Sequence, residues 1–267
     1  MELEEFKNII NSWYLVHRRD LPWRKTFDPY SILVSEIMLQ QTQVIRVLNF
    51  YDKFLNTYPT FSSLAGADNK TLFELWNGLG YWKRALNLKK IAEIIQVEYE
   101  GVFPNDIETL KTLPGVGDYT SAALKCFIYN YPVAFVETNI RKVIKHFFFP
   151  EVDNISDKEI YSIADLVLDR DNPREWNYAL MDYGSSEFKI KNVTNKAKRE
   201  SFVFSNRYYR GELIRFINQK EEVSVNEIHL LLNQIGGNKI TTNRISLILD
   251  SLVKDELIKN ENNRYFI

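Results

Sequence analysis

The chain contains 267 residues, of which 45% are hydrophobic and 26% are charged, and its formal net charge is −1. This length predicts one large domain or two smaller ones, and the hydrophobic share is enough for a real core. Because there is no global basic field, a nucleic-acid binder of this composition must concentrate its positive charge locally. The single cysteine, Cys126, excludes an internal disulfide, an all-cysteine zinc site and a four-cysteine iron–sulfur cluster.

The sequence gives no reason to expect secretion, membrane insertion or a metal centre. No apolar run reaches the ~18 residues of a membrane span. The N-terminal Met-Glu-Leu-Glu-Glu is acidic and lacks the basic-then-apolar order of a secretion signal. His17 and His146 show no metal-ligand spacing. We therefore expect a cytoplasmic protein without a metal site.

Helical periodicity dominates the chain up to about residue 188. Asp28-Pro29 is typical of an N-cap followed by a first-turn proline, and an apolar helical face follows between residues 32 and 39. Further helices are predicted, with glycine and proline between several of them, over 44–57, 71–77, 83–99, 105–112, 119–129, 138–147, 157–169 and 174–184. The predicted fold class is therefore all-α.

The composition changes near residue 188. Four lysines and Arg199 lie between residues 189 and 199 among few large apolar side chains, which is typical of an exposed basic linker, and the linker is assigned to residues 189–206. Beyond it, helices are predicted over 207–219, 225–235 and 242–254, and a turn-rich stretch at 260–263 predicts a β-hairpin. Three helices and a hairpin resemble a winged helix. The predicted domains are thus 1–188, a linker over 189–206, and a winged-helix-like domain over 207–267.

Residues 113–120 read Leu-Pro-Gly-Val-Gly-Asp-Tyr-Thr, which resembles the turn of a helix-hairpin-helix DNA-binding element. Gly115 and Gly117 allow a tight bend, and Asp118 is the expected N-cap of the helix that follows. Free N–H groups at such a helix start can hold a DNA phosphate. A carboxylate, Glu137, follows shortly afterwards, so the pattern suggests an enzyme that acts on a nucleotide.

Four further segments flank this hairpin and together resemble the MutY-type adenine DNA glycosylases of the helix-hairpin-helix (HhH-GPD) superfamily. They are Leu-Pro-Trp-Arg at 21–24, Ser-Glu-Ile-Met-Leu-Gln-Gln-Thr-Gln-Val at 35–44, Gly-Leu-Gly-Tyr-Trp-Lys-Arg-Ala at 78–85 and Trp-Asn through Met-Asp-Tyr-Gly at 176–184. The resemblance covers roughly residues 5–188, and the second segment is its most specific part. It implies two helical subdomains with the active site between them.

The resemblance also implies roles for the acids. Glu36 matches the family's acid, which protonates the leaving base and handles the water, a task that needs a raised pKa. Glu137 falls where the family usually has an aspartate that stabilises the sugar cation, and Asn139 matches a residue that orients the site. Tyr119 lies where strand-nicking relatives place a Schiff-base lysine. The resemblance therefore implies a monofunctional glycosylase.

Base flipping leaves a gap in the duplex that protein side chains must fill. Gln41 matches a family glutamine that intercalates near the base opposite the target, and Trp82 matches a wedging tyrosine. Arginine and lysine side chains are expected on the phosphates. The remaining DNA contacts that this match implies are Arg24, Gln40, Thr42, Tyr81, Arg84, Gly115, Val116, Gly117, Arg141 and Lys142.

Three departures qualify the match. Glu137 replaces the aspartate, and its extra methylene moves the carboxylate by about 1.5 Å. The family's four cysteines are missing after Phe188, so no cofactor is expected, and the linker lysines take the place of the cluster loop. Finally, residues 207–267 are too few for the Nudix-like domain with which family members commonly read 8-oxoguanine. The chain thus resembles the cluster-free members.

The sequence does not decide which base the protein removes. Adenine opposite 8-oxoguanine or guanine is favoured, because purine N7 accepts a proton and pyrimidines offer no such site. A thymine or uracil mismatch glycosylase is the nearest alternative enzyme. A non-catalytic DNA-binding protein that relies on its winged helix is the alternative from another class. The expected partner is double-stranded DNA with a mispaired or damaged base, bound by a monomer associated with the nucleoid.

Overall fold

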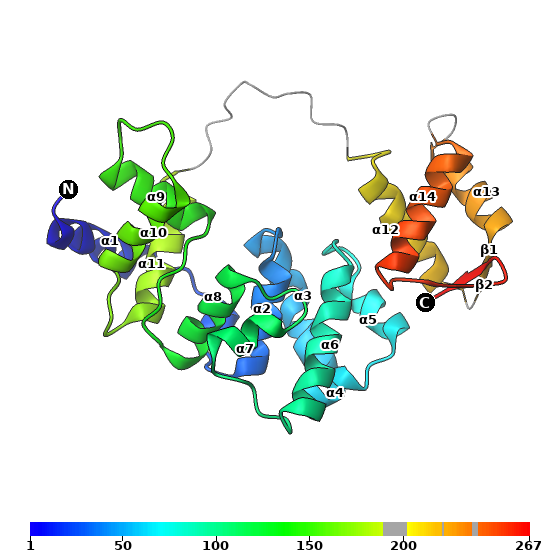
Figure 1. The fold of residues 1–267 in the computed structure, drawn as a ribbon, viewed down its shortest axis with the longest axis horizontal. Coiled ribbons are helices and arrows are strands. Elements are labelled where there is room, and N and C mark those ends of the chain that lie inside the picture. The colour runs from blue at the N-terminus through cyan, green and yellow to red at the C-terminus, as the bar shows by residue number, and fades with distance from the viewer. Residues whose placement is uncertain (189–201, 221, 237–239) are drawn as a thin grey trace. The chain divides into compact units, whose positions relative to one another are not determined.

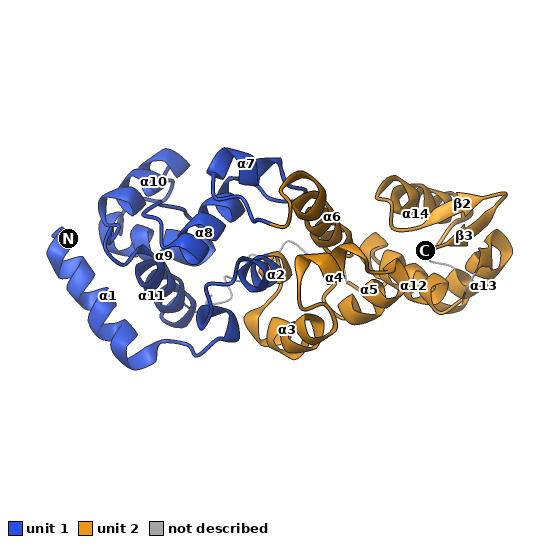
Figure 2. Ribbon diagram, turned by 90° about the horizontal axis from the view of Figure 1, so that it is seen from below, with its two compact units in different colours: residues 1–36, 102–194 blue, residues 37–101, 195–267 orange. Residues whose placement is uncertain are grey.

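A computed structural model of the chain describes residues 1–188, 202–220, 222–236 and 240–267, and most of this part is helical (Figure 1). It forms two compact units (Figure 2). Unit 1 comprises Met1–Glu36 and Val102–Thr194, and unit 2 comprises Ile37–Gly101 and Asn195–Ile267. This grouping joins the C-terminal region to residues 37–101, whereas the predicted domain boundaries lie at 188 and 207.

Unit 1 contains most of the helices that the sequence predicts for it. The observed elements of this unit are α1 (Leu3–His17), the 3₁₀ turn η1 (Pro22–Arg24), α7 (Ile107–Thr112), α8 (Asp118–Tyr129), α9 (Thr138–Phe148), α10 (Asp157–Leu166) and α11 (Pro173–Ser186). The division between the units falls within α2 (Pro29–Leu39). The sequence reading missed α1, which buries only Phe6 and Ile10 and so has a weak apolar stripe.

Unit 2 contains helices and one small sheet among its described residues. They are α3 (Val44–Thr57), α4 (Phe61–Ala65), α5 (Asn69–Trp76), α6 (Lys83–Glu98), α12 (Asn206–Asn218), β1 (Val223–Ser224), α13 (Val225–Gly236), α14 (Thr242–Lys254), β2 (Lys259–Glu261) and β3 (Arg264–Phe266). Two short elements, α4 and β1, were not predicted from the sequence.

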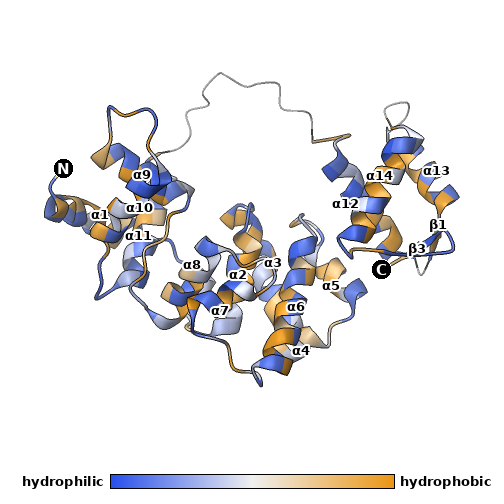
Figure 3. Cartoon of the chain, viewed as in Figure 1, coloured by the Kyte–Doolittle hydropathy of each residue, from blue (hydrophilic) through white to orange (hydrophobic). Residues whose placement is uncertain are grey.

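Local side-chain caps explain where several helices begin. The Asp28 carboxylate accepts a hydrogen bond from the Ser31 backbone N–H at 2.8 Å, which confirms the predicted cap of α2. Asp106 caps α7 in the same way. Ser156 forms a reciprocal capping box with Glu159 at the start of α10. Such helices carry both hydrophilic and hydrophobic residues, so that an apolar face can be buried (Figure 3).

Aromatic side chains form the core that joins α1, α9 and α11 in unit 1. The Phe6 ring on α1 meets Phe147 and Phe148 of α9 edge-on, with ring centroids 5.2 and 5.0 Å apart. It also meets Trp176 of α11 at 5.8 Å. Because aromatic rings bury large areas, this cluster holds the N-terminal helix on the rest of the unit.

Helices α9 and α11 approach each other closely at Gly184. A Cβ atom added to this glycine would lie 2.8 Å from both the carbonyl carbon and the Cβ of Asn139. Any larger residue would therefore push away the first turn of α9. This contact matters for the site because the first turn of α9 carries Glu137 at its N-cap.

The C-terminal part of unit 2 has the order helix, strand, helix, helix, strand, strand. Its antiparallel sheet has the strand order β1-β3-β2, in which Val223 pairs with Tyr265 and Asn260 pairs with the same residue from the other side. This confirms the predicted winged-helix-like arrangement and adds β1 to it. The part is tied to residues 37–101 by hydrogen bonds from Lys83 Nζ to the Asp255 carbonyl (2.7 Å) and from Asn218 Nδ2 to the Lys70 carbonyl (3.1 Å).

Within the described residues, no helix is both long enough and apolar enough to cross a membrane.

We predict that Gly184→Ala lowers the free energy of unfolding by about 1–3 kcal/mol, because the new methyl group overpacks the α9–α11 contact. Denaturant unfolding followed by circular dichroism measures this change. The matched control is Gly211→Ala in α12, where the added Cβ meets only the Arg215 guanidinium, no closer than 3.6 Å. This control should be neutral or stabilising by up to ~1 kcal/mol through helix propensity. Equal effects of the two substitutions would contradict the close approach.

Candidate active site

The Glu36 carboxyl is buried on α2, where only 7% of the residue is exposed. Its pKa is raised to about 7: burial raises it most, the positive charge of Arg24 lowers it, the negative charge of Glu137 raises it, and a hydrogen bond from Tyr119 lowers it. A carboxyl group with such a pKa is partly protonated at neutral pH. It can therefore donate a proton in one step and accept one in the next.

Glu137 is the N-cap of α9. One carboxylate oxygen accepts hydrogen bonds from the backbone N–H groups of Asn139 (2.7 Å) and Ile140 (2.8 Å). The other accepts one from Asn139 Nδ2 at 3.2 Å. Burial raises the pKa of Glu137, and these backbone donors oppose the shift. Because Glu137 also acts on the Glu36 carboxyl through its charge, the structure brings the two acids together in unit 1.

Tyr119 contributes a hydroxyl group to the surroundings of Glu36. Burial raises its pKa well above the ordinary value, and the negative charges of Glu36 and Glu137 add to the shift. The hydroxyl therefore stays protonated and donates a hydrogen bond to Glu36. Its ring is held edge-on against Phe135, with centroids 5.5 Å apart. The residue at this position offers a fixed donor and no amine.

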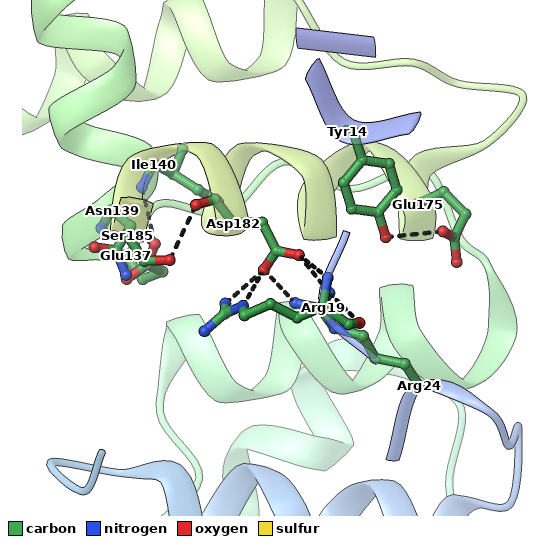
Figure 4. A network of polar contacts seen from close by, with 9 residues as sticks. All are labelled: Tyr14, Arg19, Arg24, Glu137, Asn139, Ile140, Glu175, Asp182 and Ser185. Carbon is green, nitrogen blue, oxygen red and sulfur yellow. Dashed lines mark hydrogen bonds and ion pairs between the residues drawn. The ribbon is translucent and has the colours of Figure 1, made fainter. Parts of the chain in front are cut away.

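Asp182 on α11 binds the two arginines of the site, Arg19 and Arg24 (Figure 4). Its carboxylate accepts two hydrogen bonds from the Arg24 guanidinium, both at 2.8 Å, and further bonds from the backbone N–H (3.0 Å) and Nε (2.6 Å) of Arg19. Burial would raise the pKa of Asp182, but the bonds from Arg24 and Arg19 lower it below the ordinary value. The sequence reading assigned no role to Asp182 or Arg19.

Arg24 was predicted to contact a DNA phosphate, and its position argues against that role. Only 8% of its side chain is exposed, and the guanidinium lies over the Tyr178 ring at 4.2 Å. With its hydrogen bonds directed to Asp182, it acts on the neighbouring Glu36 carboxyl by its charge. Arg24 is therefore a positioning residue of the buried site. A bidentate bond to an acid 158 positions away could not be foreseen from sequence periodicity.

Asn139 and Lys142 extend the Glu137 cluster. The Asn139 amide donates to Glu137, and Lys142 Nζ donates to the Asn139 carbonyl oxygen at 3.1 Å. Asn139 thus holds the Glu137 carboxylate by a hydrogen bond, and its role in orienting the site stays a prediction. Lys142 serves this cluster, while Arg141, the other predicted phosphate contact on α9, forms an ion pair with Asp157.

The hairpin between α7 and α8 has the expected bend, but its cap differs from the prediction. Gly115 takes a φ of +79°, which favours glycine, and Gly117 in extended conformation is the N-cap of α8. The expected cap, Asp118, is instead the first residue of the helix, and it pairs with Lys111 at 2.9 Å. Val116 is buried, and its N–H donates to the Leu113 carbonyl at 3.1 Å.

Arg84 ties two turns together within unit 2. Its guanidinium donates to the carbonyls of Ile37 (2.9 Å), Met38 (2.8 Å) and Gly80 (3.1 Å), and to Thr42 Oγ1 (3.0 Å). It also donates to the Gln40 carbonyl at 2.5 Å. Arg84 is buried, so this binding to the protein backbone argues against its predicted role as a phosphate contact.

The two turns that Arg84 joins carry the other predicted DNA contacts. Gln41 is exposed with a φ of +53°, and Tyr81 is half-buried with a φ of +48°. Trp82, by contrast, is only 8% exposed and packs edge-on against Phe73 at 5.6 Å. The indole therefore belongs to the core of unit 2, which argues against its predicted role as a wedge and leaves Tyr81 as the aromatic side chain at the surface of this turn.

The remaining predictions concern cofactors and the linker. Among the described residues, no group of three or more histidine, cysteine, aspartate or glutamate side chains could hold a metal ion. Cys126 is buried, and Asn177 Nδ2 lies 3.5 Å from its sulfur. The basic linker lysines at 189, 191, 196 and 198 lie outside the described residues, so their predicted role stays a prediction.

The chain matches a known protein family. The model of the HhH-GPD superfamily of base excision DNA repair proteins matches residues 34–167. The chain is 39% identical over 177 residues to an adenine DNA glycosylase of Mycolicibacterium smegmatis, covering 66% of this chain and 60% of that protein. The human adenine DNA glycosylase is 33% identical over 197 residues, covering 69% of this chain and 36% of that protein. The chain thus spans about 60% or less of these relatives.

Solved structures show the same fold. A thermostable thymine-DNA glycosylase superimposes with a TM-score of 0.65 at 30% identity, over 71% of this chain and 89% of that one. An endonuclease III bound non-covalently to DNA gives a TM-score of 0.62 at 17% identity, over 72% of this chain and 89% of that one. At that identity the second match supports the fold alone.

We predict that Glu36→Gln stabilises the chain in a pH-dependent way. The folded-state pKa of about 7 lies above the ordinary value of 4.5, so the folded state holds the proton more tightly. The resulting stability is present below the lower value and is lost as the pH rises through the upper one. Because glutamine does not ionise, the variant should gain about 2–3 kcal/mol over the parent between pH 5 and pH 8.

Denaturant unfolding of both chains at the two pH values measures this difference. Glu93→Gln is the control, because that side chain is 47% exposed and should change stability little at either pH. The assigned environment of Glu36 is wrong if its variant shows the same stability difference at pH 5 and pH 8.

Proposed function

Since the chain belongs to the HhH-GPD superfamily of base excision DNA repair proteins, we propose that it is a monofunctional DNA glycosylase that removes adenine mispaired with 8-oxoguanine or guanine. The observation that carries this proposal is the buried Glu36 carboxyl, with a pKa of about 7, beside Tyr119 and Glu137. The names of the bacterial and human relatives support adenine as the target.

The chemistry begins with an adenine that has left the duplex. Protonated Glu36 donates its proton to N7 of the base, and the N-glycosidic bond breaks as its electron pair moves onto the adenine. The deoxyribose then carries oxocarbenium-like positive charge, which the Glu137 carboxylate stabilises. Glu36, now ionised, accepts a proton from the attacking water. The products are free adenine and an abasic site, and both acids return to their starting states.

Each acid is suited to its task by its surroundings. The Glu36 carboxyl is buried and accepts a hydrogen bond from one hydroxyl, so the neutral acid is well populated near pH 7. Glu137 accepts two backbone N–H groups at the N-terminus of α9, where a negative charge is favoured. The pair thus divides the work between a proton donor and a charged partner.

The same geometry supports hydrolysis without strand cleavage. A lyase reaction needs an amine that attacks the sugar to form a Schiff base, and Tyr119 offers a phenol. Lys142 is the basic residue of this cluster, and its Nζ is bound to Asn139. If borohydride traps a covalent complex with DNA, the monofunctional assignment fails and Lys142 becomes the amine to replace.

A thymine or uracil mismatch glycosylase is the second candidate. It is favoured by the likeness to the thermostable thymine-DNA glycosylase at 30% identity, which extends over 89% of that chain. Adenine remains the preferred target because a pyrimidine has no N7 to receive the Glu36 proton.

A panel of duplexes with A:8-oxoguanine, A:G, T:G, U:G and undamaged pairs tests this choice. Alkali treatment after incubation cuts the strand at each abasic site, and gel electrophoresis measures the product. We expect release from the two adenine mispairs alone. Release from T:G or U:G alone would overturn the adenine assignment and establish the second candidate.

We predict that Glu36→Gln slows single-turnover base release by about 10²–10⁴-fold, because it removes the proton donor. Affinity for an uncleavable duplex should stay within about threefold of the parent. Glu93→Gln is the matched control and should release base at the parent rate. A Glu36→Gln chain as active as the parent would show that Glu36 is not the proton donor. A parent that binds DNA and releases no base would make the chain a non-catalytic DNA binder.

A further inference from the structure

Tyr178 on α11 is a buried side chain of unit 1 that takes no part in the chemistry described above. Only 3% of the residue is exposed. Its ring stacks on Phe127 of α8 with the centroids 4.4 Å apart, and the Arg24 guanidinium lies 4.2 Å from its centroid. These two neighbours fix the ring, and through the ring they fix the position of the hydroxyl group.

The packing of α8 and α11 brings Tyr178 into the surroundings of Glu36. Phe127 meets Phe135 edge-on at 5.5 Å, and Phe135 in turn meets Tyr119, which donates a hydrogen bond to Glu36, at the same distance. The negative charge of Glu36 also acts on the Tyr178 hydroxyl. A second phenol therefore lies within electrostatic reach of the proton donor that we assign.

The other polar groups around Glu36 are already engaged. Arg24 binds Asp182 through both of its terminal nitrogens, and Glu137 accepts two backbone N–H groups of α9. The Tyr178 oxygen accepts a hydrogen bond from an arginine of α11, whereas its hydroxyl proton has no acceptor in the part of the chain that the structure describes. That proton is therefore available to a ligand.

The arginine is Arg174, and it holds Tyr178 in register with the segment before α2. Its Nη2 donates to the carbonyls of Arg24 at 3.1 Å and Thr26 at 2.6 Å. Its guanidinium lies 5.7 Å from the centroid of the Tyr178 ring, and only 3% of the residue is exposed. Because the segment before α2 leads into the helix of Glu36, Arg174 also limits how Tyr178 can move relative to that acid.

The position of a proton donor at N7 determines what its neighbours meet. In a purine, N7 and the substituent on C6 lie on the same edge of the base. When Glu36 reaches N7, the groups beside Glu36 therefore lie close to that substituent. Adenine carries an amino group at C6, which donates hydrogen bonds. Hypoxanthine, which forms when water replaces that amino group, carries an oxygen there and keeps N7.

A phenol can bind either substituent, because its oxygen accepts from an amino group and its O–H donates to a carbonyl oxygen. Burial raises the pKa of Tyr178 above its ordinary value, although the positive charge of Arg174 opposes the shift, so the hydroxyl keeps its proton at neutral pH. A carboxylate could only accept and a guanidinium could only donate. Either of those groups would select one of the two bases, and a phenol does not.

We propose that the Tyr178 hydroxyl binds the C6 substituent of the extruded base, and that the protein therefore releases hypoxanthine as well as adenine. The inference rests on the proposed function, which places N7 of the purine at Glu36. The step balances as it does for adenine. Glu36 gives its proton to N7, the electron pair of the N-glycosidic bond moves onto the base, and water adds to the sugar while Glu36 takes up a proton from it. The products are free hypoxanthine and an abasic site.

The test uses three duplexes, each with one purine opposite 8-oxoguanine, that differ only at C6 of that purine. The three bases are adenine, hypoxanthine and unsubstituted purine, which keeps N7 and offers the hydroxyl nothing at C6. Single-turnover release is measured by alkaline cleavage and gel electrophoresis. We expect the parent to release hypoxanthine at a rate within about tenfold of that for adenine, because one hydrogen bond replaces another.

Two variants separate the hydroxyl from the ring. Tyr178→Phe keeps the ring against Phe127 and should slow the release of adenine and of hypoxanthine by about tenfold each, because a buried polar group loses its partner. Release of unsubstituted purine should stay within about twofold of the parent, since no such bond exists there. Tyr183→Phe makes the same change further along α11, where the ring meets Trp13 and Phe147, and should match the parent on all three bases. Circular dichroism melting confirms that both variants are folded.

The outcomes separate this inference from the proposed function. A parent that releases adenine but not hypoxanthine overturns the inference and leaves the proposed function standing. Release of hypoxanthine without adenine supports the inference and overturns adenine as the target. If Tyr178→Phe slows all three bases equally, its hydroxyl does not bind the C6 substituent. A parent that binds the duplexes and releases neither adenine nor hypoxanthine overturns both proposals.

Discussion

The arrangement depends on one buried carboxyl group. Glu36 would ordinarily be ionised at neutral pH, but the protein has withdrawn it from water and placed a second acid, Glu137, within electrostatic reach. Because burial disfavours the ionised form of the carboxyl group, Glu36 keeps its proton to a higher pH. Arg24 and Tyr119 oppose this effect enough to hold the pKa near 7. With its pKa near 7, Glu36 can donate a proton in one step and accept one in the next.

A pKa near 7 also depends on the position of a nearby cation, the Arg24 guanidinium. Arg24 lowers the pKa of Glu36 by its charge, and it is held in place because Asp182 engages both of its terminal nitrogens and Tyr178 supports its face. A buried ion pair of this kind costs several kcal/mol when one partner is removed. Gly184, two positions after Asp182, lets α11 lie against the turn that carries Glu137. One helix thus sets the position of both charges that act on Glu36.

Much of this could be predicted from the sequence, and the failures share a cause. The spacing of apolar residues located α3 and α14 within their observed bounds, and local signals found the α2 cap and the hairpin bend. The acids were found through their motif. Arg24, Arg84 and Trp82 were expected at a DNA surface through the family match, whereas the fold buries the side chains of all three. Sequence spacing cannot show a partner that only the fold supplies.

The central claim, that Glu36 gives up a proton as the base departs, is tested most directly by the pH dependence of kcat/KM for adenine release. This quantity reports the ionisation of the free enzyme. With the pKa of Glu36 at about 7, kcat/KM should fall about tenfold per pH unit above pH 8, and the midpoint of this fall should lie near pH 7. A profile that stays flat from pH 6 to pH 9 would contradict the account.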